Sequence, residues 1–100
     1  MLFAIYCQDN PGSEQLRASL MSAHKAYVAT IRERIAFAGP LFDTATSLVV
    51  GSLIVAEFTN LVALKAWLAE EPFTRGGVYM STDIRQFSNR WPQRVGFPAA

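Results

Sequence analysis

Two residues of this sequence have side chains that could together move a proton, His24 and Glu71. His24 is the sole histidine, and it lies in a segment whose apolar residues recur with helical spacing. At about 100° per residue it falls about 80° from Leu16, between Ile31 and Val28, on the apolar side of that helix. An imidazole so placed is suited to general acid–base catalysis near neutral pH. The alternative is a core histidine that is satisfied by its neighbours and does no chemistry.

Glu71 follows a second stretch of helical spacing. Counted from Leu61, it falls at about 280°, within the apolar arc of that helix. A carboxylate that enters a core alone is costly, so an inward Glu71 would need a partner such as His24. Such a carboxylate would fix the tautomer and the direction of the imidazole ring. The alternative is that Glu71, like Glu70, ends the helix in water, since Pro72 leaves the direction of its side chain open.

Three further residues are candidate substrate contacts beside this pair. Tyr6 lies in an apolar N-terminal stretch and Phe73 follows Pro72, although both residue types are also common in cores. Ser52 could donate a hydrogen bond to a ligand. It follows Gly51, which we interpret as a point of close packing in a central strand.

No metal or cofactor is expected. One cysteine and one histidine fall short of the usual zinc ligand set. The sequence also has no phosphate-binding loop and no nucleophile motif such as G-x-S-x-G. Cys7 lies within an apolar run and is interpreted as a small buried side chain. Asp9 lies in a turn cluster and is expected at the opposite end of the domain from His24.

The elements that must position these residues follow in the order β-α-β-β-α-β. This order is typical of α+β proteins with a ferredoxin-like fold. Right-handed crossovers then place both helices on one face of a four-stranded sheet, with the first and third strands in its centre. Strands are predicted at residues 2–8, 35–42, 48–58 and 78–88, the second with a break at Gly39-Pro40. Helices are predicted at residues 14–34, after Ser13 as N-cap, and from residue 61 to Pro72, after Thr59 or Asn60.

The first and third strands are apolar on both faces, although the helices cover only one. A bare apolar sheet face is rare in soluble monomers, so we expect a symmetric homodimer in which two sheets pack face to face. Residues 1–88 would form the domain. Residues 89–100 would form a tail that could reach the partner through Trp91, Val95 and Phe97. On the first helix, Arg17 is placed away from the apolar arc, on the solvated side.

Composition excludes several classes of protein. Hydrophobic residues make up 51% of the chain, which suffices for a core without a metal or a disulfide. The formal charge is +1 and the basic residues are scattered, so no nucleic-acid partner is expected. No stretch has the length of a membrane span or the features of a signal peptide. The single cysteine carries no mark of secretion, so we expect a cytoplasmic location and no membrane partner.

Several short pieces of the sequence, taken in order, resemble the YCII-related family of small dimeric α/β-barrel proteins. They are residues 2–12, 23–27, 38–41, 51–55, 66–67 and 71–73, and together they cover about residues 2–87. The resemblance implies a ferredoxin-like protomer, a sheet-to-sheet dimer and an active site centred on a His/Asp pair, with His24 at the position of the family's histidine. Two positions depart from the family pattern. Glu71-Pro72-Phe73 replaces Asp-Pro-Phe or Asp-Pro-Tyr, and Met21 stands where an Arg often precedes the histidine.

One branch of this family looks like dehydrochlorinases of chlorinated hydroquinone breakdown, and the wider superfamily includes muconolactone isomerases. From the resemblance and the His24–Glu71 pair we expect a cofactor-independent lyase or isomerase that acts on a small cyclic or aromatic catabolite. His24 would be its acid or base and Glu71 the orienter. With Met21 in place of Arg, a substrate anion would lose a clamp, or the substrate would be neutral. The alternatives are an accessory protein that binds a small molecule in the same pocket without chemistry, and a purely structural dimerisation module.

Overall fold

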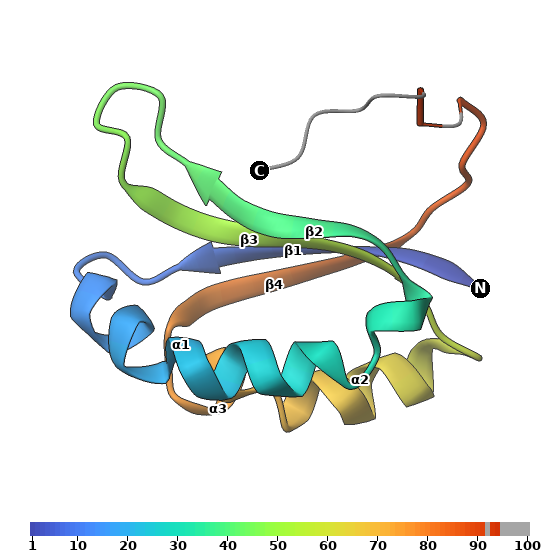
Figure 1. The fold of residues 1–100 in the computed structure, drawn as a ribbon, viewed down its shortest axis with the longest axis horizontal. Helices are drawn as coiled ribbons and strands as arrows, with labels where there is room; N and C mark the ends of the chain where they lie inside the picture. The colour runs from blue at the N-terminus through green and yellow to red at the C-terminus, as the bar shows by residue number, and fades with distance from the viewer. Residues whose placement is uncertain (92, 95–100) are drawn as a thin grey trace.

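The computed structural model of the chain describes residues 1–91, 93 and 94. Its elements, in order, are β1 (Leu2–Asp9), α1 (Glu14–Ala29), the 3₁₀ helix η1 (Arg32–Arg34), β2 (Ile35–Phe42), β3 (Val49–Glu57), α2 (Leu61–Ala69), α3 (Pro72–Arg75) and β4 (Tyr79–Gln86). The strands form one antiparallel sheet in the order β2-β3-β1-β4 (Figure 1). β1 and β3 are therefore the central strands, and the predicted α+β, ferredoxin-like fold is confirmed.

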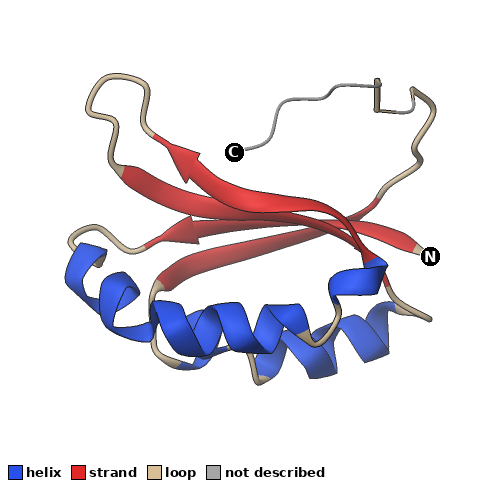
Figure 2. Cartoon of the chain, viewed as in Figure 1, coloured by secondary structure: helices blue, strands red, loops and turns tan. Residues whose placement is uncertain are grey.

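The helices lie on one side of the sheet, so the fold has two layers (Figure 2). Along β1 the buried side chains alternate, because successive residues of a strand point to opposite faces. Phe3, Ile5 and Cys7 point toward the helices and are buried. Ile54 and Ala56 lie opposite Ile5 and Phe3 in the ladder with β3, so they share that face. The core also contains Ile31, Phe58, Leu64 and Leu68.

The edge strand β2 runs without a break through Gly39 and Pro40, where the sequence predicted an interruption. Pro40 lies opposite Ser52 of β3 in the ladder. Because β2 is at the edge of the sheet, the N–H that Pro40 lacks is not needed by a further strand. The irregularities of register lie near the ends of the strand instead, between Ile35 and Phe37 and between Leu41 and Phe42.

α1 is shorter than predicted. Ser13 occupies the N-cap position, but its hydroxyl donates to the carbonyl oxygen of Asn10 at 2.7 Å and caps no amide. The helix ends at Ala29, residues 30–31 form a turn, and the short 3₁₀ helix η1 follows before β2 begins. The apolar spacing continues through this turn, which explains why the sequence predicted one longer helix.

The second predicted helix is divided into two. Asn60 caps α2, since its side-chain oxygen accepts a hydrogen bond from the N–H of Ala63 at 2.9 Å. α2 ends at Ala69, and α3 begins at Pro72 with Glu71 as its N-cap. The first turn of a helix tolerates proline, because the N–H that proline lacks would have no partner there. The prediction that Glu71 belongs to the end of α2 was therefore wrong. Pro72 begins a helix as well as preventing the previous one from continuing.

Gly51 marks a close approach between the two central strands, as predicted. A Cβ atom added to it would lie 2.4 Å from the carbonyl oxygen of Cys7 on β1. Backbone atoms on both sides of this contact belong to the sheet ladder, so neither strand can move away without losing pairing. Glycine at this position lets β1 and β3 remain paired next to Ser52.

The face of the sheet away from the helices carries apolar side chains of several strands. Tyr6 is 44% exposed and lies opposite Leu53, and Phe37 is exposed to the same extent. Beyond β4, Trp91 is exposed, whereas the other predicted anchors of the tail, Val95 and Phe97, lie outside the described residues. Of the helices in the described part of the chain, none is both long and apolar enough to cross a bilayer.

Candidate active site

The structure brings His24 and Glu71 together. His24 extends from the middle of α1, and its Nδ1 contacts Oε1 of Glu71, the residue that precedes α3. The side chain of His24 is 16% exposed and that of Glu71 is 1% exposed. The pair is thus formed where α1 meets α3, on the helix-covered side of the sheet.

The second carboxylate oxygen of Glu71 binds to Thr74 and not to His24. Oε2 accepts hydrogen bonds from the backbone N–H of Thr74 at 3.1 Å and from its hydroxyl at 3.3 Å. Burial by itself acts to raise the pKa of Glu71, but the hydrogen bonds from His24, Phe73 and Thr74 outweigh it and the pKa lies below its ordinary value. Glu71 is therefore a carboxylate at neutral pH.

This charge state determines where the proton of a neutral His24 lies. A carboxylate can only accept hydrogen bonds, so Nδ1 must carry the hydrogen that lies between it and Oε1 of Glu71. Nε2 is then left with a free lone pair and is the nitrogen able to take a proton. A carboxylate that holds one imidazole nitrogen while the other exchanges protons is the arrangement used in general acid–base catalysis.

The ring of Phe73 supports His24 from within the core. The two ring centroids are 3.8 Å apart and the planes differ by 5°, so the rings are stacked flat. Tyr79 contacts the same phenyl ring edge-on, with centroids 5.9 Å apart. Phe73 is completely buried, so its ring contacts protein rather than solvent. The structure therefore brings Phe73 to the pair as a support for His24.

Arg17 is the residue of this region that the sequence analysis missed. It was expected on the solvated side of the first helix, yet it is only 6% exposed. Its Nε and Nη2 donate to the carboxylate of Asp9 at 2.9 and 3.3 Å, and Nη2 also donates to the carbonyl of Gly51 at 3.0 Å. Paired in this way, a guanidinium can be buried. Its position seven residues before His24, two turns away on the same helix face, was the available signal.

Ser52 takes part in the same hydrogen-bond network and is buried. Its Oγ accepts from Nη2 of Arg17 at 2.7 Å and from the hydroxyl of Tyr79 at 3.0 Å. Burial raises the pKa of Tyr79, although the hydrogen bond with Ser52 opposes this effect. Asp9, expected as an isolated turn residue, is the last residue of β1 and anchors Arg17.

Tyr6 is not brought to His24. Side chains alternate along β1, so Tyr6 points to the open face while its neighbour Cys7 points to the helices. Cys7 is fully buried, as predicted, and burial raises the pKa of its thiol to about 11. It is thus a core residue and not a nucleophile at neutral pH.

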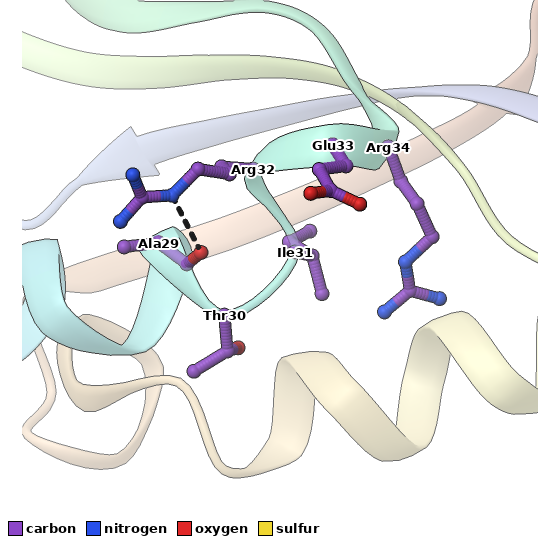
Figure 3. A pocket seen from close by; sticks show the side chains of 6 residues that line it. All are labelled: Ala29, Thr30, Ile31, Arg32, Glu33 and Arg34. Atoms are coloured by element: carbon purple, nitrogen blue, oxygen red, sulfur yellow. Dashed lines mark hydrogen bonds between the residues drawn. The ribbon is translucent and has the colours of Figure 1, made fainter.

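Two hollows on the surface lie away from the pair. The first, of about 320 Å³, is formed by residues 29–34, where Nε of Arg32 donates to the carbonyl of Ala29 at 3.4 Å (Figure 3). The second is lined by Met1, Arg34 and residues 57–59. Neither includes His24 or Glu71. The side chain of His24 is nevertheless 16% exposed, so it is not sealed from solvent.

Comparison with known proteins places the chain in a family. The YCII-related domain matches residues 1–88, which include every residue of the site just described. The chain belongs to the YCII-related family. Its YCII-related relatives include Protein YciI of Escherichia coli, which is 33% identical over 94 residues that cover 87% of this chain and 96% of the relative. An uncharacterized protein of Haemophilus influenzae is 31% identical over the same shares of both chains.

A solved structure of the same fold adds a chemical comparison. The 5-chloro-2-hydroxyhydroquinone dehydrochlorinase TftG of Burkholderia phenoliruptrix AC1100, in complex with 2,5-dihydroxybenzoquinone, is similar to this YCII-related chain with a TM-score of 0.83. The two are 29% identical, and the similarity covers 88% of this chain and 94% of TftG. A protein of this fold thus binds a small hydroxylated ring.

Proposed function

We propose that this YCII-related protein is a cofactor-independent lyase or isomerase that acts on a small hydroxylated ring, with His24 as its acid or base. The observation that carries the proposal is the contact between Nδ1 of His24 and Oε1 of Glu71. The likeness to TftG supports elimination of a halide from a ring as the reaction.

The reaction proposed is the loss of HX from the ring. In the keto tautomer of the ring, the carbon that bears X is sp³. Nε2 of His24 takes a proton from a ring carbon or hydroxyl of this tautomer, and the electron pair left behind forms a new double bond and expels X as a halide ion. Because the ring loses one proton and one halide ion, the step needs no external oxidant or reductant. Glu71 stabilises the imidazolium that forms, and the imidazolium then releases its proton to solvent. The same groups would serve an isomerase by returning the proton to another ring atom.

A homodimer belongs to the same proposal. Tyr6 and Phe37 give the open sheet face an exposed apolar character that a second copy would cover. Packing of two such sheets face to face would give a closed, symmetric dimer. Residues 1–88 would then form the body of each protomer, and residues 89–100 a tail near the partner.

The experiment measures chloride release from 5-chloro-2-hydroxyhydroquinone by the wild-type protein and three variants. We expect His24→Gln to lower the rate by a factor on the order of 10² to 10⁴, the usual contribution of an acid–base group. Glu71→Gln is expected to lower it less, because it orients the base and does not transfer the proton. Lys25→Gln is the matched control, since Lys25 is an exposed neighbour of His24 on α1.

Two results would argue against this function. An unchanged rate in a folded His24→Gln protein would remove His24 from the chemistry. Binding of 2,5-dihydroxybenzoquinone that shifts the NMR signals of His24, with no chloride released from the chlorinated ring, would instead indicate an accessory protein that uses the same site for binding.

A further inference from the structure

Arg17 is held more firmly than a helix residue near a surface needs to be. The contacts are the forked pair with Asp9, the carbonyl of Gly51 and the hydroxyl of Ser52. They tie the first half of α1 to the ends of β1 and β3. A guanidinium can be buried only where such partners pair with it. The position of this cation in the fold is therefore fixed on several sides.

The fixed cation lies against the ring that supports His24. Cζ of Arg17 is 4.6 Å from the centroid of Phe73, a distance typical of a cation–π contact. His24 stacks on the same phenyl ring at 3.8 Å. Residues seven apart on a helix are separated by about 10.5 Å along its axis. The side chains of Arg17 and His24 thus both contact the one phenyl ring.

The two contacts of His24 constrain different degrees of freedom. The bond to Glu71 fixes the position of Nδ1, but a single hydrogen bond leaves the ring free to rotate about it. The flat stack on Phe73, with planes 5° apart, fixes the plane of the imidazole. Because proton transfer at Nε2 needs a defined lone-pair direction, the plane matters for the proposed chemistry.

We infer that Arg17 is a positioning residue for the His24–Glu71 pair and that it acts through the ring of Phe73. This inference rests on the proposed function for its catalytic consequence. The positioning itself is a property of the ligand-free protein. A rival explanation is that Arg17 only fastens α1 to β1 through its ion pair with Asp9.

The test uses ¹⁵N NMR of the imidazole in the ligand-free protein. His24 is the sole histidine, so its two nitrogen signals need no further assignment to a residue. When the imidazole is neutral, we expect well-separated shifts in the wild type, with hydrogen on Nδ1 and a lone pair on Nε2. In Arg17→Met we expect the two shifts to move toward each other, as the ring reorients and both tautomers become populated. Phe73→Leu, which removes the flat stack, should give the same change.

Asp9→Asn separates the two explanations. It removes the charge of the ion pair but leaves an oxygen to accept from Arg17, so Arg17 remains over the ring. We expect it to lower the urea midpoint while the ¹⁵N shifts stay close to those of the wild type. Equal shift changes in Asp9→Asn and Arg17→Met would favour a role of Arg17 in attaching α1 to β1 alone, and would overturn the inference. Unchanged shifts in Arg17→Met would overturn it as well.

Arg17→Lys keeps the inference testable if Arg17→Met does not fold. Lysine retains the cation but lacks the fork that contacts Asp9, Gly51 and Ser52 together. We expect a convergence of the ¹⁵N shifts smaller than in Phe73→Leu, and no convergence would overturn the inference. If chloride release is detected, Arg17→Lys should lower kcat with little change in KM, because Arg17 does not touch the substrate. Failure of the chloride assay would leave the NMR result intact.

Discussion

Glu71 contacts Nδ1 of His24 with one carboxylate oxygen and caps the first turn of α3 with the other. Glu71, the carboxylate of the pair, is therefore also the N-cap of the helix that contains Phe73. Placement of the carboxylate and placement of the stacking ring are coupled through a single residue. This coupling explains how a short segment of four helical residues can support both contacts of His24.

Replacement of Glu71 should destabilise the fold as well as the pair. In Glu71→Gln the charge-assisted contact with His24 is lost and the cap of α3 is weakened, so we expect a loss of about 1–3 kcal/mol. Urea unfolding would measure it. Glu70→Gln is the matched control, because Glu70 is exposed and its ion pair at 3.3 Å is with the equally exposed Arg75. A change within about 0.5 kcal/mol is expected there. Equal losses in both variants would contradict the assignment.

The contribution of Glu71 to stability should depend on pH. Its pKa is lower in the folded protein than its ordinary value of 4.5. A lowered pKa means that the carboxylate stabilises the fold above about pH 4.5 and that this stabilisation disappears as pH falls through the folded value. The difference in unfolding free energy between wild type and Glu71→Gln should therefore shrink below about pH 4.5. Urea titrations at several pH values would measure it, and a constant difference would argue against an ionised Glu71.

Gly51 should not tolerate even the smallest side chain. A Cβ there would lie 2.4 Å from the carbonyl oxygen of Cys7, so Gly51→Ala must force the central strands apart. We expect a loss of about 1–3 kcal/mol in urea or thermal unfolding. Gly39→Ala is the control within the same sheet, because a Cβ at Gly39 meets nothing within 4 Å. A Gly51→Ala protein as stable as Gly39→Ala would show that the strands relax without cost.

The proposed dimer predicts a contrast between two exposed apolar residues. Tyr6→Lys places a charge on the open sheet face, where Tyr6 is exposed, and should convert the dimer to monomers. Val62→Lys changes a residue of α2 that is 77% exposed on the other layer, and should leave assembly unchanged. Sedimentation velocity would distinguish the masses. A wild-type protein that sediments as a monomer would remove the dimer from the proposal.

Strand order and the central strands of the core could be predicted from the sequence. The inner face of α1 could not, since its buried residue is Arg17 while Leu16 is exposed. The pairing of His24 with Glu71 was also within reach, since two helices with inward polar residues end at the same side of this topology. The boundary between α2 and α3 was not, because a proline after an apolar helix marks an end whether or not a new helix begins. The direction of Glu71 depends on its cap to the N–H of Thr74, which is local, and on its contact with His24, which lies 47 residues away in the sequence.

Arg17 was missed although it shares a helix face with His24, seven residues along α1. An arginine early in a helix is normally solvated, and its burial here depends on acceptors from Asp9, Gly51 and Ser52 that are remote in sequence or lie in a neighbouring turn. Ser52 was predicted as a ligand contact because its real partners, Arg17 and Tyr79, come from other elements and could not be seen in the local sequence. Local pattern indicates which face a residue occupies, but not which polar groups meet it.

The division between α2 and α3 has a consequence for how this site can vary among homologues. The acid lies at the start of a four-residue helix that is joined to α2 and β4 by short connections. A homologue with a shorter or longer acid at this position would have to displace that one turn, and Phe73 with it, to keep the contact with Nδ1 of the histidine. The length of the acidic side chain and the position of the stacking ring would therefore change together.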